Sequence, residues 1–231
     1  VLPFCGGAEG DVRQERRVSF RPRTPHERTV WFRQTGGDRR SQSRMSTWTA
    51  ETAEWYAAKY GEYATNQLGI DALALSHDDD VLDIGCGTGA ALRHAARMVR
   101  TGRLVGVDPV RRMIDIAKER AASHPEGHRI EFHEGSADRV PVADDSADVV
   151  LAFDSFDHWD DTEVGLAEVA RVLKPSGRFA VVKDGGLPGA KDARRAFTEK
   201  MNEGGFEIVS EEQLTDGDVA CTLWVFVQAR R

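Results

Sequence analysis

The stretch VLDIGCGTGAALRH, residues 81–94, constrains the fold of this chain more than any other feature. A short apolar run leads into an aspartate, three glycines follow at alternate positions, and an alanine-rich segment comes next. Glycine is used where the backbone turns sharply or lies against a ligand. A buried strand, a bare-backbone loop and a helix in this order predict a ligand-binding loop beyond the carboxyl end of a strand in an α/β sheet.

The rest of the chain after residue 45 continues this alternation of strand-like and helical segments. Helical spacing predicts a first amphipathic helix over about 49–66. The strands expected after it are VLDI, RLVGVD, RIEFHEG, ADVVLAF, RFAVVKD, FEIVSE and ACTLWVFVQ, and the expected helices cover 88–99, 109–121, a segment ending at KPSG, and 189–203. Alternating strands and helices predict a Rossmann-like, doubly wound, mainly parallel sheet with helices on both faces.

The composition and the cysteines limit the class of protein. With 231 residues, the chain is long enough for one α/β domain with a sizeable core. It contains no apolar run near the roughly 18–20 residues of a membrane span. Its three cysteines, Cys5, Cys86 and Cys221, are far apart and odd in number, which is typical of neither a disulfide framework nor a zinc site. We therefore expect a cytoplasmic protein that has no membrane partner.

The first 44 residues differ from the rest, because they contain ten arginines and no lysine against five acids. Two interpretations remain open for this leader: a tail that binds nucleic acid or another partner, or a disordered extension ahead of Met45. The remainder is acidic, which argues against broad binding to a phosphate backbone. The expected organisation is a leader over 1–44 and one domain over 45–231, with a lid helix within 45–68.

The glycine loop fits two ligands, and Asp83 helps to separate them. Gly85, Gly87 and Ala90 satisfy the G-x-G-x-x-G/A pattern of dinucleotide sites, so a nicotinamide cofactor is one candidate. A dinucleotide would place its anionic pyrophosphate beside the Asp83 carboxylate, which would repel it. S-adenosylmethionine carries an ammonium and a sulfonium and has no phosphate. Asp83 therefore favours S-adenosylmethionine.

The following strands supply groups for an adenosine. Asp108 ends RLVGVD, where its carboxylate can accept hydrogen bonds from both ribose hydroxyls, a feature common to both ligands. Asp138 could accept from an adenine amino group while the backbone beside Ala137 contacts the ring edge. Met113 either covers the adenine face or packs in the core.

Four segments together resemble the class I S-adenosylmethionine-dependent methyltransferases, especially the group that acts on small molecules. They are VLDIGCGTG, LVGVDPVRRMIDIAKERA, EGSADRVPVADDSADVVLAFDSFDHWDD and EVARVLKPSGRFAVV. The resemblance implies a seven-stranded sheet with an antiparallel last strand, S-adenosyl-L-methionine as cofactor and a small-molecule acceptor. The candidate cofactor-binding residues are Asp83, Gly85, Cys86, Gly87, Gly89, Asp108, Pro109, Met113, Ala137, Asp138 and Phe153. The alternatives are a nicotinamide-dependent oxidoreductase and a non-catalytic regulator that binds S-adenosylmethionine.

Candidates for proton transfer lie in FDSFDHWDD, directly after the fourth strand. Methyl transfer needs a general base only when the nucleophile arrives protonated. His158 has the appropriate ordinary pKa, and Asp154 and Asp157 are the alternatives. In the competing interpretation His158 and Trp159 are structural, with Trp159 packed beneath the pocket and Asp160 and Asp161 capping the next helix.

Three tyrosines of the first helix, Tyr56, Tyr60 and Tyr63, are candidate substrate-binding residues. Either the helix closes over the cofactor and presents them to the substrate or the sulfonium, or the same stripe is buried against the sheet. Asp154 and Asp184 end neighbouring strands and could hold a hard cation. Catechol-type methyltransferases add an asparagine where this chain has Gly185, so no metal is expected.

Overall fold

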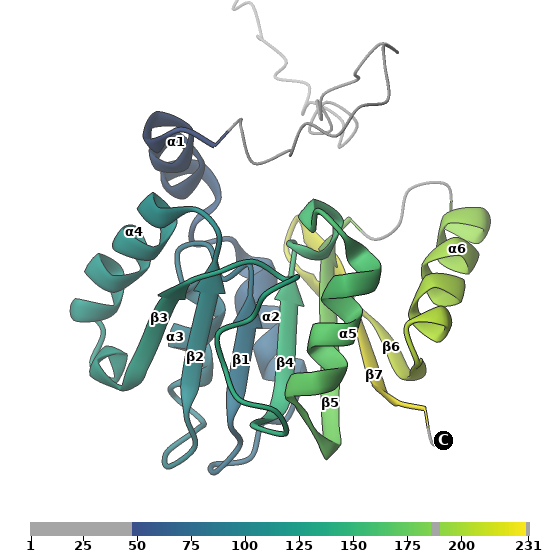
Figure 1. Ribbon diagram of the computed structural model, residues 1–231. Coiled ribbons are helices and arrows are strands. Elements are labelled where there is room, and N and C mark those ends of the chain that lie inside the picture. Colours follow the sequence, from purple (N-terminus) through teal and green to yellow (C-terminus); the bar gives the residue numbers. More distant parts are fainter. Residues whose placement is uncertain (1–47, 186–189, 230–231) are drawn as a thin grey trace, which may run out of the picture. The chain divides into compact units, whose positions relative to one another are not determined.

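The computed structural model describes residues 48–185 and 190–229, so the arginine-rich leader over 1–44 and Met45 lie outside the described residues. A seven-stranded sheet forms the centre of the described part, in the order β3-β2-β1-β4-β5-β7-β6 (Figure 1). The strands are β1 (Val81–Ile84), β2 (Leu104–Asp108), β3 (Ile130–Glu134), β4 (Ala147–Phe153), β5 (Leu173–Asp184), β6 (Phe206–Asp216) and β7 (Val219–Gln228). The order reverses between β1 and β4, which is where sheets of this kind bind ligands.

The direction of the strands confirms the predicted Rossmann-like fold. Strands β1 to β5 pair in parallel, whereas β7 pairs antiparallel with both β5 and β6. The helices are α1 (Ala50–Tyr60), α2 (Ala64–Ala72), α3 (Ala90–Ala95), α4 (Arg111–Ala122), α5 (Thr162–Val172) and α6 (Ala190–Glu203), with 3-10 turns η3 (Gly127–Arg129) and η4 (Phe156–His158). No helix of the described residues is long and apolar enough to cross a membrane.

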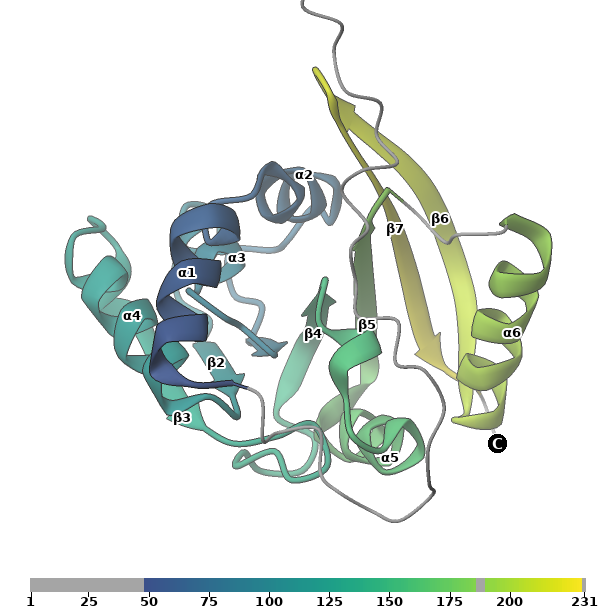
Figure 2. The same ribbon diagram turned by 90° about the horizontal axis from the view of Figure 1, so that it is seen from above.

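Two apolar clusters cover the two faces of the sheet. Helices α2, α3 and α4 lie on one side of the sheet and α5 and α6 on the other (Figure 2). Their buried side chains belong to the two separate clusters. Strand β4 supplies both clusters by alternation: Val149 and Leu151 belong to the first, and Val150 and Ala152 to the second. Both faces are therefore buried, which explains the nearly continuous apolar runs in the sequence.

The single helix expected over 49–66 is wrong, because two helices occupy this segment. Helix α1 ends at Tyr60 and α2 begins at Ala64. Gly61 lies between them, and a Cβ there would stand only 2.8 Å from the Thr88 side chain and 2.4 Å from the carbonyl oxygen of Ala57. The close approach to the loop after β1 breaks the helix, and helical periodicity does not report such a tertiary contact.

Two other boundaries differ from the expectation. Helix α3 is shorter than 88–99, because it begins after Gly89, whose φ of 74° is left-handed. Strand β5 begins at Leu173 and includes KPSG, because Leu173 pairs with Ala147 before a register shift. The preceding helix does end ahead of KPSG, at Val172. Residues 174–177 have no partner in this register, so the proline and the glycine lie in the irregular part of the strand, where these residues are usually found.

Candidate cofactor and acceptor site

The loop after β1 is held in a left-handed conformation that suits glycine. Gly85, Gly87 and Gly89 have φ values of 76°, 50° and 74°. A Cβ at Gly85 would lie 2.5 Å from the Cβ of Ser155, and one at Gly89 would lie 2.7 Å from the Phe132 ring. No described atom lies within 4 Å of a Cβ placed on Gly87. Two glycines thus allow close packing, and Gly87 presents bare backbone to open space.

Asp83 is buried in front of this loop with an unused acceptor. Asp83 is only 2% exposed, and its Oδ1 has no hydrogen-bond partner among the described residues. Burial, and secondarily the charge of Asp108, raises the pKa of Asp83 to about 8. A buried acceptor without a partner is costly, and a bound donor with a positive charge would relieve that cost. The residue fits a ligand that carries an ammonium group.

Asp108 ends β2, and its carboxylate supports the glycine loop. Its Oδ2 accepts from the Gly87 N–H at 3.0 Å, and its Oδ1 accepts from the Val110 N–H at 2.9 Å. Burial is the largest influence on this carboxyl and raises its pKa to about 6, although the two N–H donors act in the opposite direction. Each oxygen keeps a second lone pair, so the carboxylate can still accept from ribose hydroxyls. The role in shaping the loop was not expected from the sequence.

The remaining cofactor candidates fall into different environments. Cys86 is buried, and its burial raises the thiol pKa well above the ordinary value. Pro109 is half-buried at the end of β2. Met113 is 2% exposed yet belongs to neither apolar cluster of the described residues, which leaves its role as a cover for adenine a prediction. Phe153 differs, because its ring packs against α2, where a Cβ on Gly69 would be 2.6 Å away.

The segment after β3 presents both adenine candidates. Ala137 is buried and contributes to the cluster beneath α5. Asp138 is exposed and accepts a short hydrogen bond from the Ser136 hydroxyl. An exposed carboxylate beside a buried alanine is compatible with a ring edge lying along this segment, and the assignment stays a prediction.

Four aromatic side chains of the α1 segment form a continuous group, here called the aromatic arch: Trp48, Tyr56, Tyr60 and Tyr63. The ring centroids are 5.3 Å apart for Trp48 and Tyr56, 5.1 Å for Tyr56 and Tyr60, and 6.3 Å for Tyr60 and Tyr63. All four are half-buried, and neither apolar cluster of the described residues contains them. The arch is therefore separate from the core. Trp48 was not among the aromatic candidates expected from the sequence. The signal that could have found it is its spacing of eight residues from Tyr56.

The surroundings of Tyr56 place the arch toward the ends of the strands. Burial raises the pKa of Tyr56 to about 12, and the charges of Asp154, Asp108 and Asp184 act in the same direction. These three carboxylates stand at the ends of, or directly after, β4, β2 and β5. The hydroxyl is accordingly a protonated hydrogen-bond donor at neutral pH. Its position agrees with a lid over the edge of the sheet that carries the glycine loop.

Asp154 acts as a tie between elements at the end of β4. Its backbone φ is 51°, an uncommon conformation for a residue other than glycine. Its Oδ2 accepts from the Thr65 hydroxyl at 3.0 Å, and its Oδ1 accepts from the Asp184 N–H at 2.7 Å. Burial, the largest influence, raises its pKa. Because both oxygens already hold α2 and β5, the structure places Asp154 in a bracing position at the site.

The following residues combine exposed and buried side chains. His158 is exposed in η4, while Trp159 is buried and stacks on Phe179 with centroids 6.2 Å apart. Trp159 thus packs within the apolar cluster on the α5 and α6 side of the sheet. Asp161 caps α5 by accepting from the Glu163 and Val164 N–H groups. In the described ranges no group of three or more His, Cys, Asp or Glu residues could hold a metal ion.

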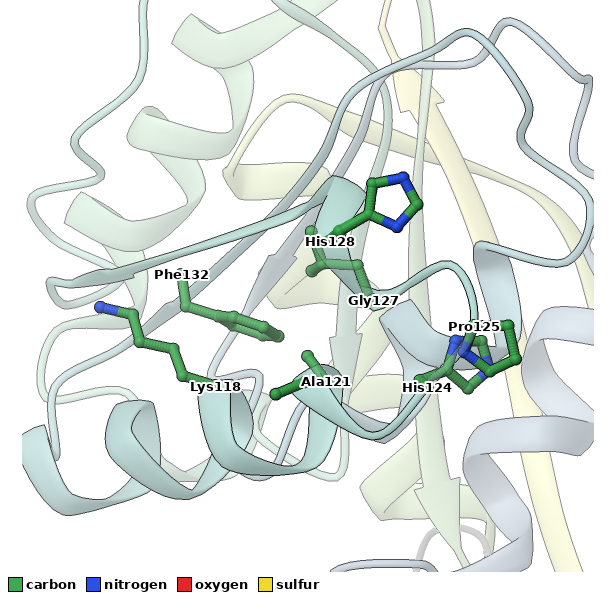
Figure 3. Close-up of a pocket in the computed structure, with 9 residues that line it drawn as sticks. Lys118, Ala121, His124, Pro125, Gly127, His128 and Phe132 are labelled. Carbon is green, nitrogen blue, oxygen red and sulfur yellow. The ribbon is translucent and has the colours of Figure 1, made fainter.

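A pocket lies away from these residues, between the end of α4 and β3 (Figure 3). Its volume is about 480 Å³, and it is lined by Lys118, Ala121, Ala122, His124, Pro125, Gly127, His128, Ile130 and Phe132. Since Ala121 is near the end of α4 and Ile130 begins β3, it opens at the amino ends of the parallel strands. It includes none of the residues predicted for the cofactor or the acceptor.

Residues 82–181 match a family model described as a methyltransferase domain. Over these residues the chain is a methyltransferase domain. A curated relative, methyltransferase GfsG of Streptomyces halstedii, is 38% identical over 125 residues, which cover 54% of this chain and 44% of that protein. Erythromycin 3''-O-methyltransferase of Saccharopolyspora erythraea is 34% identical over 116 residues, 50% of this chain and 38% of that protein.

The solved structures agree on the fold of this methyltransferase domain. A SAM-dependent methyltransferase from Aquifex aeolicus superimposes with a TM-score of 0.65 at 16% identity, covering 78% of this chain and 99% of that one. The chain spans about half the length, or less, of most of the curated relatives that it matches. The region that matches the family model runs from β1 into β5 and includes the glycine loop and Asp108.

Proposed function

We propose that this chain transfers a methyl group from S-adenosyl-L-methionine to a hydroxyl oxygen of a small-molecule acceptor. The observation that carries the proposal is the buried carboxylate of Asp83, whose Oδ1 lacks a described partner beside bare backbone at Gly87. This arrangement suits a positively charged ligand that lies against the loop. It suits a diphosphate less well, because the ionised carboxylate would repel the phosphates and the protonated carboxyl would offer them no opposite charge.

The residues at the loop would hold the cofactor by complementary charge and hydrogen bonding. Asp83 would accept from the ammonium group, and Asp108 would accept from the ribose hydroxyls with its remaining lone pairs. Asp138 and the backbone at Ala137 would contact the adenine. When bound, the cofactor supplies a methyl group on a positively charged sulfur that leaves as a neutral thioether.

The chain's own contribution to the reaction is alignment and the exclusion of water. The aromatic arch would cover the strand ends and offer ring faces to the positive charge of the sulfonium, an interaction worth about 0.5–2 kcal/mol. Asp154 would fix α2 against β5 at the end of β4. Fixed geometry of this kind lowers the barrier of an in-line displacement.

A hydroxyl acceptor must lose its proton during the transfer, and His158 is the residue that we propose as the general base. It follows β4 in an exposed turn, and its ordinary pKa is near neutrality. Asp154 is the weaker candidate, because both of its oxygens already accept hydrogen bonds. The oxygen as the nucleophile is supported by relatives named O-methyltransferases, which the chain matches over about half its length.

The test combines binding with turnover on the full chain. Calorimetric titration with S-adenosylmethionine, S-adenosylhomocysteine and NAD should give binding for the first two and none for NAD. Incubation with methyl-labelled S-adenosylmethionine and a panel of hydroxyl-bearing small molecules should transfer label to an oxygen. Preferential binding of NAD would overturn the proposal. Tight binding of S-adenosylmethionine with no transfer to any acceptor would instead indicate a non-catalytic regulator.

A further inference from the structure

The turn between α1 and α2 contacts the end of the glycine loop directly. The Thr88 hydroxyl donates to the carbonyl oxygen of Gly61 at 2.5 Å, and Thr88 is the residue between the last two loop glycines, Gly87 and Gly89. A Cβ at Gly61 would collide with the Thr88 side chain, so the two backbones approach as closely as glycine allows. The segment that carries the aromatic arch is thus joined to the predicted cofactor loop.

Glu62 adds a charged tie at the same turn. Its Oε1 accepts from Nη2 of Arg93 and from Nη1 of Arg120, each at 2.5 Å. The Arg93 side chain is only 9% exposed, and its Nη1 also donates to the carbonyl oxygen of Thr88 at 2.6 Å. A buried guanidinium requires a compensating carboxylate, and Glu62 is the one that pairs with it among the described residues.

The rest of α1 is attached more loosely. It packs mainly on α4, where Ala53 and Ala57 are its buried residues. Its ion pair between Glu54 and Arg112 lies at the surface, where such pairs contribute little to stability. The pair between Glu62 and Arg120 is equally exposed, so the buried Arg93 is what distinguishes the contacts of Glu62. Helix α2, by contrast, packs on α3 and on strands β4 to β7. The position of α1 over the strand ends therefore depends on the turn that holds Glu62.

We propose that Glu62 is a positioning residue that couples the aromatic arch to the glycine loop, so that the loop and the lid over the cofactor move as one unit. The proposal rests on the proposed function for the meaning of the lid, although the tie itself belongs to the protein without ligand. Glu62 lies between Tyr60 and Tyr63 of the arch, and Arg93 joins it to Thr88 of the loop. Without the carboxylate, the turn after α1 would lose its ion pairs with Arg93 and Arg120, and the hydrogen bond from Nη2 of Arg120 to the carbonyl oxygen of Ala57 would remain.

The first experiment needs no ligand. Amide hydrogen exchange, read by mass spectrometry, compares the full chain with its Glu62→Gln and Glu54→Gln variants. We expect residues 50–60 to exchange about ten-fold faster in Glu62→Gln, with β1 and β4 unchanged, because local opening reports local stability. Glu54→Gln is the matched control on the same helix and should change exchange by much less. Equal exchange in α1 of all three proteins would overturn the proposal.

The second experiment measures the coupling to the cofactor. Calorimetry with S-adenosylhomocysteine should give an affinity about ten-fold weaker for Glu62→Gln than for the unmodified chain, with Glu54→Gln close to the latter. The cofactor should protect residues 50–60 from exchange in the unmodified chain and fail to do so in Glu62→Gln. Unchanged affinity together with unchanged protection would contradict the coupling. A chain that does not bind S-adenosylhomocysteine at all would refute the proposed function and leave the first experiment to decide on the tie.

A second variant covers the case in which Glu62→Gln does not fold. Thr88→Val removes the hydrogen bond to Gly61 and preserves the shape and the charge of the side chain. It should accelerate exchange in α1 in the same direction while the melting curve stays cooperative. Unchanged exchange in a folded Thr88→Val variant would contradict the part of the proposal that joins the turn to the loop through the Thr88 hydroxyl, and faster exchange would support it.

Discussion

Replacing Asp83 by asparagine separates charge from shape in the predicted cofactor loop. In the free protein, burial raises the pKa of Asp83 to about 8, so the carboxyl is largely protonated at pH 7. Asparagine is of similar size and also neutral. We therefore expect Asp83→Asn to fold normally and to differ from the parent chiefly when a cationic ligand binds.

The size of the effect follows from this pKa. Binding an ammonium group favours the ionised carboxylate, and the ionised fraction of a group with a pKa of about 8 rises about ten-fold between pH 6 and pH 7. The affinity for S-adenosylhomocysteine should therefore rise about ten-fold over this interval, with at most about two-fold more from Asp108, whose pKa is about 6. Below pH 7 the ammonium of the ligand stays protonated, since ordinary α-amino groups titrate at about 7.7–8.0.

Calorimetry across this pH range tests the prediction. The parent chain should release close to one proton per ligand, measured by repeating the titration in buffers of different ionisation enthalpy. Asp83→Asn should bind at least about ten-fold more weakly at pH 7 and show an almost flat pH dependence, because a charge-assisted hydrogen bond of about 1.5–3 kcal/mol is lost. Equal affinity of the two proteins, or an equal pH slope, would refute the reasoning about Asp83.

The same group predicts how stability depends on pH. The folded pKa of Asp83 lies above its unfolded value of 3.8, so the unfolded chain releases this proton at lower pH. Asp83 therefore reduces the free energy of unfolding as the pH rises from about 4 to about 8, by about 1.4 kcal/mol per pH unit within that window. Asp83→Asn removes this loss, so its melting temperature at pH 8 should exceed that of the parent. A lower melting temperature at pH 8 would mean that the carboxylate is stabilised by a group near it.

Three further substitutions test the loop, the proposed base and the arch. Gly89→Ala should cost about 1–3 kcal/mol of stability and lower the melting temperature by several degrees, because it combines a left-handed φ with a clash against Phe132. Gly205→Ala is the control, because Gly205 has a similar φ and an added Cβ there meets no described neighbour within 4 Å. This control should cost less. His158→Asn should lower kcat about 10²–10⁴-fold, with unchanged affinity for S-adenosylhomocysteine and loss of the acidic limb of the kcat profile; an unaltered kcat would exclude it as the base. Tyr56→Ala should weaken cofactor binding about two- to thirty-fold, while Tyr56→Phe keeps the ring and binds almost normally; equal losses would assign the effect to the hydroxyl.

The sequence was sufficient for the architecture because its signals are local. Apolar runs bounded by turn residues predicted all seven strands, and the aspartate and glycines of 81–94 predicted where the ligand loop lies. These patterns follow from backbone geometry and from the burial of both faces of the sheet, which act within a few residues. The boundaries that depend on distant partners were wrong: the break at Gly61 and the early start of β5 at Leu173.

Only the tertiary structure decided what the site residues do. Burial raises the pKa of Asp83 to about 8 and leaves its Oδ1 without a described partner, and Asp108 supports the loop through the Gly87 N–H. Asp154, a candidate base in the sequence, accepts hydrogen bonds from α2 and β5, and its role as a base stays a prediction. The contacts of Glu62 with two arginines from other helices follow from no local pattern. The sequence determines which functional groups a chain contains. Desolvation, and the partners that folding brings within about 3 Å, determine the charge and the role of each group.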